Sequence, residues 1–115
     1  MRVLVVDDDR AVRTVLCDVL AEEGFDVVGA GADGIEAVEL AAALEPDAIL
    51  LDVRMPRLGG IEAARKIRPL NPTVRLIMLS AYDDPALRNE AEAAGASAFL
   101  FKGCKLSEIV DAIGD

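Results

Sequence analysis

Five polar residues in this 115-residue chain stand at the ends of short apolar segments, where their side chains could do chemistry. They are Asp7, Asp8, Asp52, Ser80 and Lys102. Carboxylates brought within about 4 Å repel each other by roughly 4 kcal/mol at an effective dielectric of about 20. A hard divalent cation removes this conflict, and Mg²⁺ suits a site with few carboxylates and retained waters. Such a site commonly serves phosphoryl transfer, in which a lysine adds positive charge and Asp52 would be the nucleophile that forms an acyl phosphate.

The elements that must position these residues alternate between apolar strands and helical patterns. Strands are predicted over residues 2–6, 26–30, 47–51, 74–79 and 97–101. This alternation indicates an α/β fold with a doubly wound parallel sheet, covered by helices on both faces. Right-handed crossovers place the carboxyl ends of all the strands at one edge of the sheet. In the order 2-1-3-4-5 the first and third strands are neighbours, so the three carboxylates would converge.

Capping residues mark where the helices begin. Asp9 and Asp33 are N-cap candidates, and Asp84 followed by Pro85 is a strong start signal. The helices are expected to end at Gly24, before Pro46, at Arg68, at Gly95 and at Ile113. The expected apolar faces are Val12, Val15, Leu16 and Val19 in the first helix, and Ile35, Val38, Ala42 and Leu44 in the second.

The composition excludes several classes of function. The chain has no His, so it cannot build a Ser-His-Asp or Cys-His pair, a His-ligated metal site, a histidine kinase or a histidine phosphocarrier. Its 12 Lys and Arg against 21 Asp and Glu give a net charge of −9, which should repel nucleic acid. Cys17 and Cys104 are too few and too far apart for a CxxC site, and they suggest a reducing compartment.

The length fits one domain, expected over residues 1–115. The first apolar run, Val3 to Val6, is too short for a signal peptide. No stretch approaches the ~20 apolar residues of a membrane span. These observations predict a cytoplasmic protein that binds neither membranes nor nucleic acid directly.

The motifs at the strand ends resemble those of the receiver domains of two-component response regulators. The matching segments are Val5-Val6-Asp7-Asp8, Leu51-Asp52-Val53-Arg54-Met55-Pro56, Ser80-Ala81 and Lys102, in the order and spacing of that family. Each is weak alone, and the combination is highly specific. The resemblance covers essentially the whole chain and implies the flavodoxin-like receiver fold.

The resemblance implies a role for each matching position. Asp52 would accept a phosphoryl group from the phosphohistidine of a sensor histidine kinase or a phosphotransfer protein. Asp8, Asp52 and the backbone carbonyl of Arg54 would bind Mg²⁺ directly, while Asp7 would act largely through a water. Lys102 would pair with the phosphoryl group. The modified state would then control an output domain or an effector protein.

The resemblance also implies a conformational switch. Ser80 would hydrogen-bond a phosphoryl oxygen and move toward it, and Phe99 would turn inward as Ser80 moves. Ala81 matches a small residue that leaves the phosphoryl pocket open. The segment from Asp84 to Ile113 matches the usual docking face of the family.

Three positions depart from the family pattern. Gly103 stands where the family has Pro, usually after a cis bond, and a cis bond is disfavoured before any other residue. Gly59 stands where the family often has Asp, and Phe99 replaces the commoner Tyr. Cys104, close to Lys102, is interpreted as a small packing residue rather than a reactive thiol.

Two other interpretations share the fold. A pseudo-receiver would bind a partner without phosphorylation, but such proteins usually lose an acid or the lysine, and this chain has them all. A flavodoxin-like electron carrier needs a hydroxyl- and Gly-rich loop after the first strand, where this chain has Asp7-Asp8-Asp9-Arg10. The tail after Leu106 is short for a complete last helix, which favours a receiver cut from a longer regulator over a stand-alone one.

Overall fold

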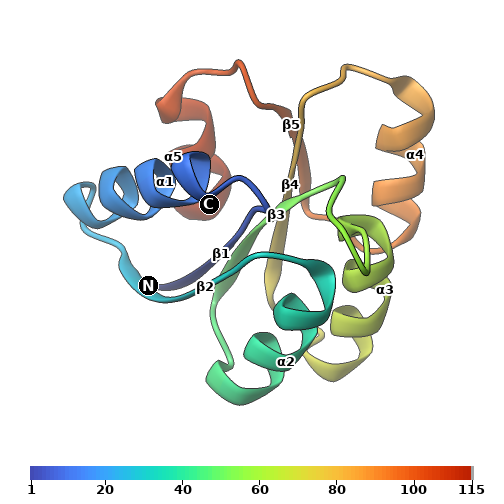
Figure 1. Cartoon of the computed structure of the whole chain (residues 1–115), viewed down its shortest axis with the longest axis horizontal. Helices are drawn as coiled ribbons and strands as arrows, with labels where there is room; N and C mark the ends of the chain where they lie inside the picture. The colour runs from blue at the N-terminus through green and yellow to red at the C-terminus, as the bar shows by residue number, and fades with distance from the viewer. Residues whose placement is uncertain (115) are drawn as a thin grey trace.

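Five short apolar segments form the parallel strands of the computed structural model, which describes residues 1–114 (Figure 1). They are β1 (Arg2–Val6), β2 (Asp26–Gly31), β3 (Ala48–Asp52), β4 (Arg75–Ser80) and β5 (Ala98–Phe101). The strands pair in the order β2-β1-β3-β4-β5, which confirms the predicted doubly wound sheet. The domain predicted from the sequence runs to Asp115, a residue that lies outside the described part of the chain.

A helix follows each strand. The helices are α1 (Arg10–Glu22), α2 (Gly34–Leu44), α3 (Gly60–Leu70), α4 (Pro85–Ala93) and α5 (Leu106–Gly114). The carboxylates of Asp9, Asp33 and Asp84 accept hydrogen bonds from backbone N–H groups in the first turns of α1, α2 and α4. These bonds satisfy N–H groups that have no partner within the helix, so the predicted caps are confirmed.

Both faces of the sheet are covered, and the core therefore has two halves. Helices α1 and α5 lie on one face, and α2, α3 and α4 lie on the other (Figure 1). Val3 and Val5 of β1 pack with Leu20 under α1 and α5. Leu4 and Val6 of the same strand point to the opposite half. Because both faces are buried, every position of this strand after its first is apolar.

The buried face of α1 agrees with the predicted one only in part, because Leu16 packs against the core as expected but Val15 does not. Val15, predicted to be buried, is 58% exposed, whereas Leu20 is completely buried. Leu16 and Cys17 pack against the same half of the core as Leu20. Leu16 and Leu20 lie four residues apart, on the side of the helix that faces the sheet, and a leucine has more apolar surface to bury than a valine.

The predicted face of α2 is also wrong in part, because its closest contacts are made by its smallest residues. Ala42 is exposed, and the fully buried positions are Gly34, Ala37 and Ala41. The Gly34 N–H donates a 2.9 Å hydrogen bond to the carbonyl oxygen of Leu58. A Cβ atom at position 34 would lie 2.2 Å from that oxygen, so this approach of α2 to the β3–α3 loop requires glycine.

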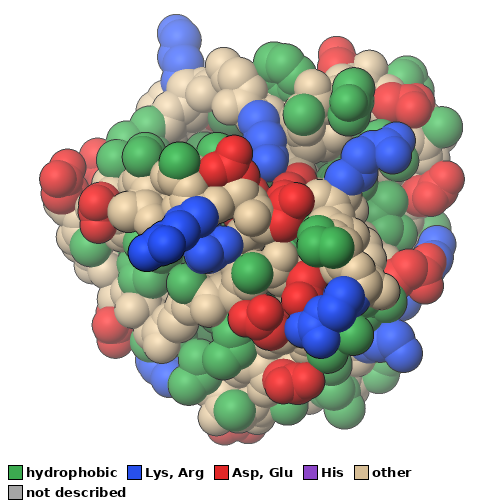
Figure 2. Space-filling model, viewed as in Figure 1, with side chains coloured by type: hydrophobic (Ala, Val, Ile, Leu, Met, Phe, Trp, Pro, Cys, Tyr) green, Lys and Arg blue, Asp and Glu red, His purple; other side chains and the backbone are tan. Residues whose placement is uncertain are grey.

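The excess negative charge is not gathered in one place on the face seen in Figure 1. Acidic and basic side chains are interspersed across that face, with apolar side chains between them (Figure 2). Within residues 1–114, no helix is long and apolar enough to cross a membrane.

Candidate functional site

The sheet brings the predicted acids together at the carboxyl ends of its strands. Asp52 is the last residue of β3, and Asp7 and Asp8 directly follow β1. In the parallel register Val6 lies opposite Leu51, so the next residues, Asp7 and Asp52, are also neighbours. One carboxylate oxygen from each of the three acids lies within 4.8 Å of the other two. The predicted convergence of the carboxylates is therefore observed.

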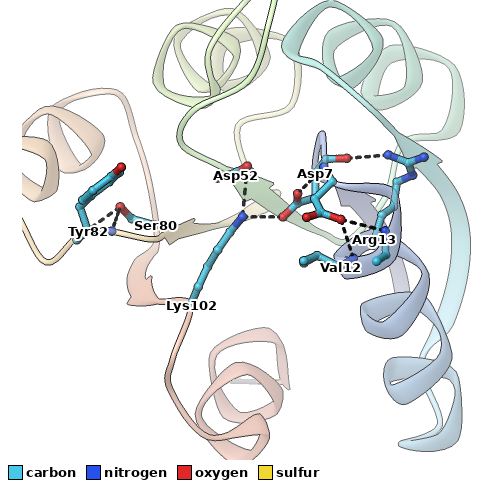
Figure 3. Close-up of polar contacts among 9 residues, drawn as sticks. Asp7, Val12, Arg13, Asp52, Ser80, Tyr82 and Lys102 are labelled. Atoms are coloured by element: carbon cyan, nitrogen blue, oxygen red, sulfur yellow. Dashed lines mark hydrogen bonds and ion pairs between the residues drawn. The ribbon is translucent and has the colours of Figure 1, made fainter.

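Lys102 reaches the acids from the end of β5. Its Nζ lies 2.9 Å from Asp7 Oδ2 and 3.2 Å from Asp52 Oδ2, so one ammonium group bridges two carboxylates (Figure 3). Asp7 is 1% exposed and Asp52 is 5% exposed. A quarter of the lysine side chain is open to solvent. Because the acids are buried and the lysine is partly exposed, the cluster of Asp7, Asp52 and Lys102 is accessible from the side of the lysine.

The electrostatics of the site are unfavourable for two ionised carboxylates. Burial, followed by the negative charge of Asp7, raises the pKa of Asp52 to about 6, against the opposing effect of Lys102. Burial lowers the pKa of Lys102, but its contacts with Asp7 and Asp52 outweigh burial and leave that pKa raised. The lysine therefore stays charged at neutral pH and offsets part of the repulsion between the acids.

The residues present fit a divalent cation. Three ionised carboxylates and one ammonium leave a net charge of −2, which a divalent cation would neutralise. Within the described chain, the buried Asp7 Oδ2 accepts no hydrogen bond, although it contacts the Lys102 ammonium. Its unfilled acceptor capacity suits a hydrated metal ion. Oxygen ligands of this kind are those that Mg²⁺ prefers.

Helix α1 holds Asp7 in place through its first residues. Asp7 Oδ1 accepts a 2.9 Å hydrogen bond from the Asp9 N–H. The guanidinium of Arg13 donates a 2.7 Å hydrogen bond from Nη1 to the Asp7 carbonyl oxygen (Figure 3). Arg13 was not singled out from the sequence. Its place one turn into a helix that follows the acids is the signal that could have indicated it.

Gly60 lets helix α3 approach the end of β3. A Cβ atom at this position would lie 2.0 Å from the Asp52 carbonyl oxygen. The Gly60 N–H donates a 2.8 Å hydrogen bond to the carbonyl oxygen of Val53. The sequence predicted a loop here, without this role. Gly60 therefore sets the position of the backbone that carries the central acid.

Ser80 points away from the acids. Its hydroxyl donates a 2.8 Å hydrogen bond to the Tyr82 carbonyl oxygen and accepts a 3.0 Å bond from the Tyr82 N–H (Figure 3). Ser80, Ala81 and Tyr82 line a cavity of about 190 Å³ together with Asp52 and Lys102. The serine is thus beside the cavity but bonded within its own loop, and a group bound in the cavity would compete for the hydroxyl.

Phe99 is already inside the protein in this structure. Its ring is 6% exposed, the Arg88 guanidinium carbon lies 5.0 Å from the ring centre, and Arg88 Nη1 donates to the Phe99 carbonyl oxygen at 3.3 Å. The ring is therefore buried while Ser80 is still bonded to Tyr82.

The conformation of the segment after Lys102 depends on Gly103. There is no cis peptide bond in residues 1–114, so the Lys102–Gly103 bond is trans. The ring of Phe101 folds over Gly103, where a Cβ atom would lie 2.5 Å from a ring carbon. Burial raises the pKa of the Cys104 thiol, which agrees with a packing residue rather than a reactive one.

Comparison with known proteins decides the family. The model of the response regulator receiver domain matches residues 3–114. The chain belongs to the response regulator receiver family. Receivers are signalling switches rather than enzymes with a separate substrate, and accepting a phosphoryl group on an aspartate is their standard function. Neither the pseudo-receiver nor the electron carrier is favoured by these findings.

Individual relatives support the same assignment. Over 112 residues the receiver is 40% identical to the transcriptional regulatory protein PdtaR of Mycobacterium tuberculosis, covering 97% of this chain and 54% of PdtaR. The chain thus spans about half the length of that relative. The response regulator domain of Thermotoga maritima CheB is 38% identical, with a TM-score of 0.88, covering 99% of this chain and 93% of that one. A chain of the CheX–CheY–BeF3–Mg²⁺ complex from Borrelia burgdorferi is 29% identical, with a TM-score of 0.92, covering 98% and 86%.

Proposed function

We propose that Asp52 is the phosphoacceptor of this receiver. The observation that carries the proposal is the single ammonium group of Lys102 between Asp7 and Asp52, in the wall of a cavity that Asp52 and Ser80 also line. Above pH 6 the Asp52 carboxylate is mostly ionised and is a competent nucleophile. Its oxygen attacks the phosphorus of a phosphohistidine, the P–N bond breaks, and the imidazole leaves with its electron pair and takes up a proton. The product is an acyl phosphate on Asp52.

The cation in this proposal is Mg²⁺. Asp8, Asp52 and the Arg54 carbonyl oxygen would hold it directly, with Asp7 acting through a water. When bound, it supplies positive charge that neutralises the oxygens of the incoming phosphoryl group. The three clustered carboxylates and the relative that was solved with BeF3 and Mg²⁺ support this choice.

Lys102 and Ser80 are the groups that would respond to the phosphoryl group. The ammonium of Lys102 would pair with a phosphoryl oxygen. Ser80 would exchange its bonds to Tyr82 for one to the phosphoryl group, which releases the β4–α4 loop. Phe99, already buried beneath Arg88, would hold the inward position that the released loop favours. Hydrolysis of the acyl phosphate by water returns the carboxylate and inorganic phosphate, and it resets the switch.

The partners follow from this chemistry. We propose that a sensor histidine kinase or a phosphotransfer protein supplies the phosphoryl group, and that an output domain or effector protein reads the change. The effector surface would be the segment from Asp84 to Ile113. We propose no direct contact of this domain with nucleic acid or membrane, and one receiver domain over residues 1–115.

Intact-protein mass spectrometry tests the assignment of the acceptor. The chain is incubated with acetyl phosphate and Mg²⁺, and we expect a gain of one phosphoryl group. Asp52→Asn should abolish that gain. The matched control is Asp18→Asn, which changes an exposed acid on α1 by the same one atom and should leave the gain intact. A phosphoryl group retained by the Asp52→Asn protein would contradict the assignment, and a wild-type chain that gains none would contradict the proposed function.

A further inference from the structure

The loop that joins β3 to α3 has hydrogen bonds at both ends and at Pro56 and Leu58, but not at Arg54 and Met55. The Val53 N–H donates to the Leu79 carbonyl oxygen at 3.0 Å, and the Gly60 N–H donates to the Val53 carbonyl oxygen at 2.8 Å. Among residues 1–114, the backbone groups of Arg54 and Met55 make no hydrogen bond. The carbonyl oxygen proposed to bind the cation therefore lies in a segment that its own main chain does not anchor.

An ion pair between the buried Asp33 carboxylate and the largely exposed Arg57 side chain anchors the loop to a different helix. The guanidinium of Arg57 contacts Asp33 Oδ2 through Nε at 2.8 Å and through Nη2 at 2.7 Å. Asp33 is 5% exposed, and its other oxygen caps α2 by accepting the Glu36 N–H at 2.9 Å. Two nitrogens of the planar guanidinium thus meet the same carboxylate oxygen, which restricts the orientation of the guanidinium as well as its position. The Gly34–Leu58 hydrogen bond is a second tie between the same two elements.

The backbone at Arg57 is strained. Its φ is 65°, and the Leu58 N–H donates to the Pro56 carbonyl oxygen at 2.7 Å, which together describe the rarer, positive-φ form of the γ-turn. This region costs an arginine about 1 kcal/mol, whereas Gly or Asn would occupy it more easily. A residue that is unfavourable for its backbone conformation is held there by its side chain. The ion pair with Asp33 is the contact that holds it.

We propose that Arg57 and Asp33 form a positioning pair that orients the β3–α3 loop for cation binding. The inference rests on the proposed function, because it takes the Arg54 carbonyl as a ligand. The pair fixes the loop three residues beyond Arg54, while the Val53 bond fixes it one residue before. The carbonyl between these two anchors is then held before the cation arrives, and binding need not order the loop.

The direction in which Arg57→Asn changes the Kd for Mg²⁺ distinguishes a positioning role from a simple effect of charge. Arg57→Asn removes a positive charge from the loop that follows Asp52, and charge alone would then strengthen Mg²⁺ binding. Loss of the anchor would weaken it. We expect the Kd for Mg²⁺, measured by isothermal titration calorimetry, to rise about tenfold, as is typical when a group that orients a metal ligand is lost. Asn is chosen because it tolerates the positive φ.

Two further proteins complete the test. Arg65→Gln removes the same charge from an exposed ion pair with Glu62 on α3, and it should leave the Kd unchanged or slightly lower. Asp33→Asn keeps an N-cap for α2 but loses the nearer charge partner of Arg57, leaving Glu36 at 3.9 Å. If the two residues act as a pair, adding Arg57→Asn to Asp33→Asn should raise the Kd by much less than tenfold. Hydrogen exchange without metal should be faster at the hydrogen-bonded Leu58 and Gly34 N–H groups in the Arg57→Asn protein, at an unchanged free energy of global unfolding.

The outcomes distinguish this inference from the proposed function. If wild type binds Mg²⁺ and Arg57→Asn binds it equally or more tightly, the positioning role is wrong and the proposed function stands. If the two substitutions are fully additive, the residues do not act through each other and the pair is refuted. A wild-type chain that gives no Mg²⁺ binding overturns both the proposed function and the inference.

Discussion

The two edges of the sheet carry cavities of very different character. The cavity at the carboxyl ends of the strands measures about 190 Å³ and is lined by Asp52, Ser80 and Lys102. The cavity at the amino ends is larger, about 540 Å³, and lies between the ends of α2 and α3 with Ile67 and Leu70 in its wall. Volume alone would place the functional site at the amino edge. The distribution of charge places it at the carboxyl edge.

The polar groups at the amino edge are satisfied by the fold. Asp47 is exposed, and its carboxylate accepts a 2.7 Å hydrogen bond from the Arg2 N–H. The Arg2 guanidinium donates to the carbonyl oxygens of Leu44 and Glu45, which closes the end of α2. At the carboxyl edge, buried acids instead repel each other. Repulsion between buried charges in the folded protein is thus a better indicator of function here than the size of a cavity.

The largest effect should come from the glycine behind Asp52. Gly60→Ala sets a Cβ atom 2.0 Å from the Asp52 carbonyl oxygen, so the strand end or α3 must move. We expect a loss of about 3 kcal/mol in the free energy of unfolding, measured by urea denaturation, since overpacking against backbone cannot relax easily. Phosphorylation by acetyl phosphate should fall as well.

Gly59→Ala is the matched control for this prediction. The nearest atom to its added Cβ is the Val53 carbonyl oxygen at 3.3 Å, a contact that a small shift relieves. Its unfolding free energy should change by less than about 1 kcal/mol. Equal losses at positions 59 and 60 would show that the loop, and not the approach to Asp52, limits stability at this edge.

Removing the lysine should expose the charge conflict directly. Lys102→Met leaves Asp7 and Asp52 without their shared cation, and the pKa of Asp52 should rise above 6. We expect a loss of about 2 kcal/mol at pH 8, below the range for a fully buried pair because a quarter of the lysine is exposed. The loss should shrink at pH 5, where Asp52 is protonated. Lys105→Met, which changes an exposed lysine, should lose little at either pH.

The sequence was sufficient to predict the site's acids and lysine, for a physical reason. Strands of a covered parallel sheet are apolar throughout, so the first polar residue after each of them marks an edge. Right-handed crossovers put all of those edges on the same side. Asp7, Asp52 and Lys102 are found together because these rules depend on topology and not on side-chain packing.

Contacts between helices and loops could not be predicted in this way. The face of α2 was misassigned in part because an apolar pattern ranks residues by size, whereas Gly34 is buried for its lack of a side chain. The ion pair of Arg57 with Asp33 joins residues that are 24 positions apart, and both would be taken as solvated charges or caps. Only the packing of α2 against the β3–α3 loop makes them partners.

Removing the buried charge of Asp52 should stabilise the fold, by less than Lys102→Met destabilises it. The folded pKa of Asp52, about 6, exceeds its ordinary value of 3.8. Stability from this group is therefore complete below about pH 4 and is lost as the pH rises through 6. Asp52→Asn should raise the unfolding free energy at pH 8 by about 1 to 2 kcal/mol, and the gain should vanish near pH 4.

With Mg²⁺ at pH 8 the wild type should become more stable than Asp52→Asn, the reverse of the order without metal. This reversal sharpens the contrast between the two edges of the sheet. A cation at one hundred times its Kd adds about 2.7 kcal/mol to the wild type, and Asp52→Asn has lost one of its ligands. Asp47→Asn, the equivalent change at the amino edge, should show neither the gain at pH 8 nor the reversal. Thermal unfolding with and without Mg²⁺ checks all three proteins, and an Asp52→Asn protein less stable than wild type at pH 8 without metal would contradict the expected conflict.

The smallest effect is expected in the larger cavity. Leu70 lines it and is 66% exposed, so Leu70→Ala removes little buried surface. The unfolding free energy should change by less than about 0.5 kcal/mol, and the Kd for Mg²⁺ and the extent of phosphorylation should equal those of the wild type. A changed Kd would mean that the amino edge is coupled to the acids through the sheet. Leu70 ends the helix that Gly60 begins, so such coupling would pass through α3. If the Kd for Mg²⁺ is unchanged in Leu70→Ala and raised in Gly60→Ala, then cation binding depends on the first residue of α3 and not on its last.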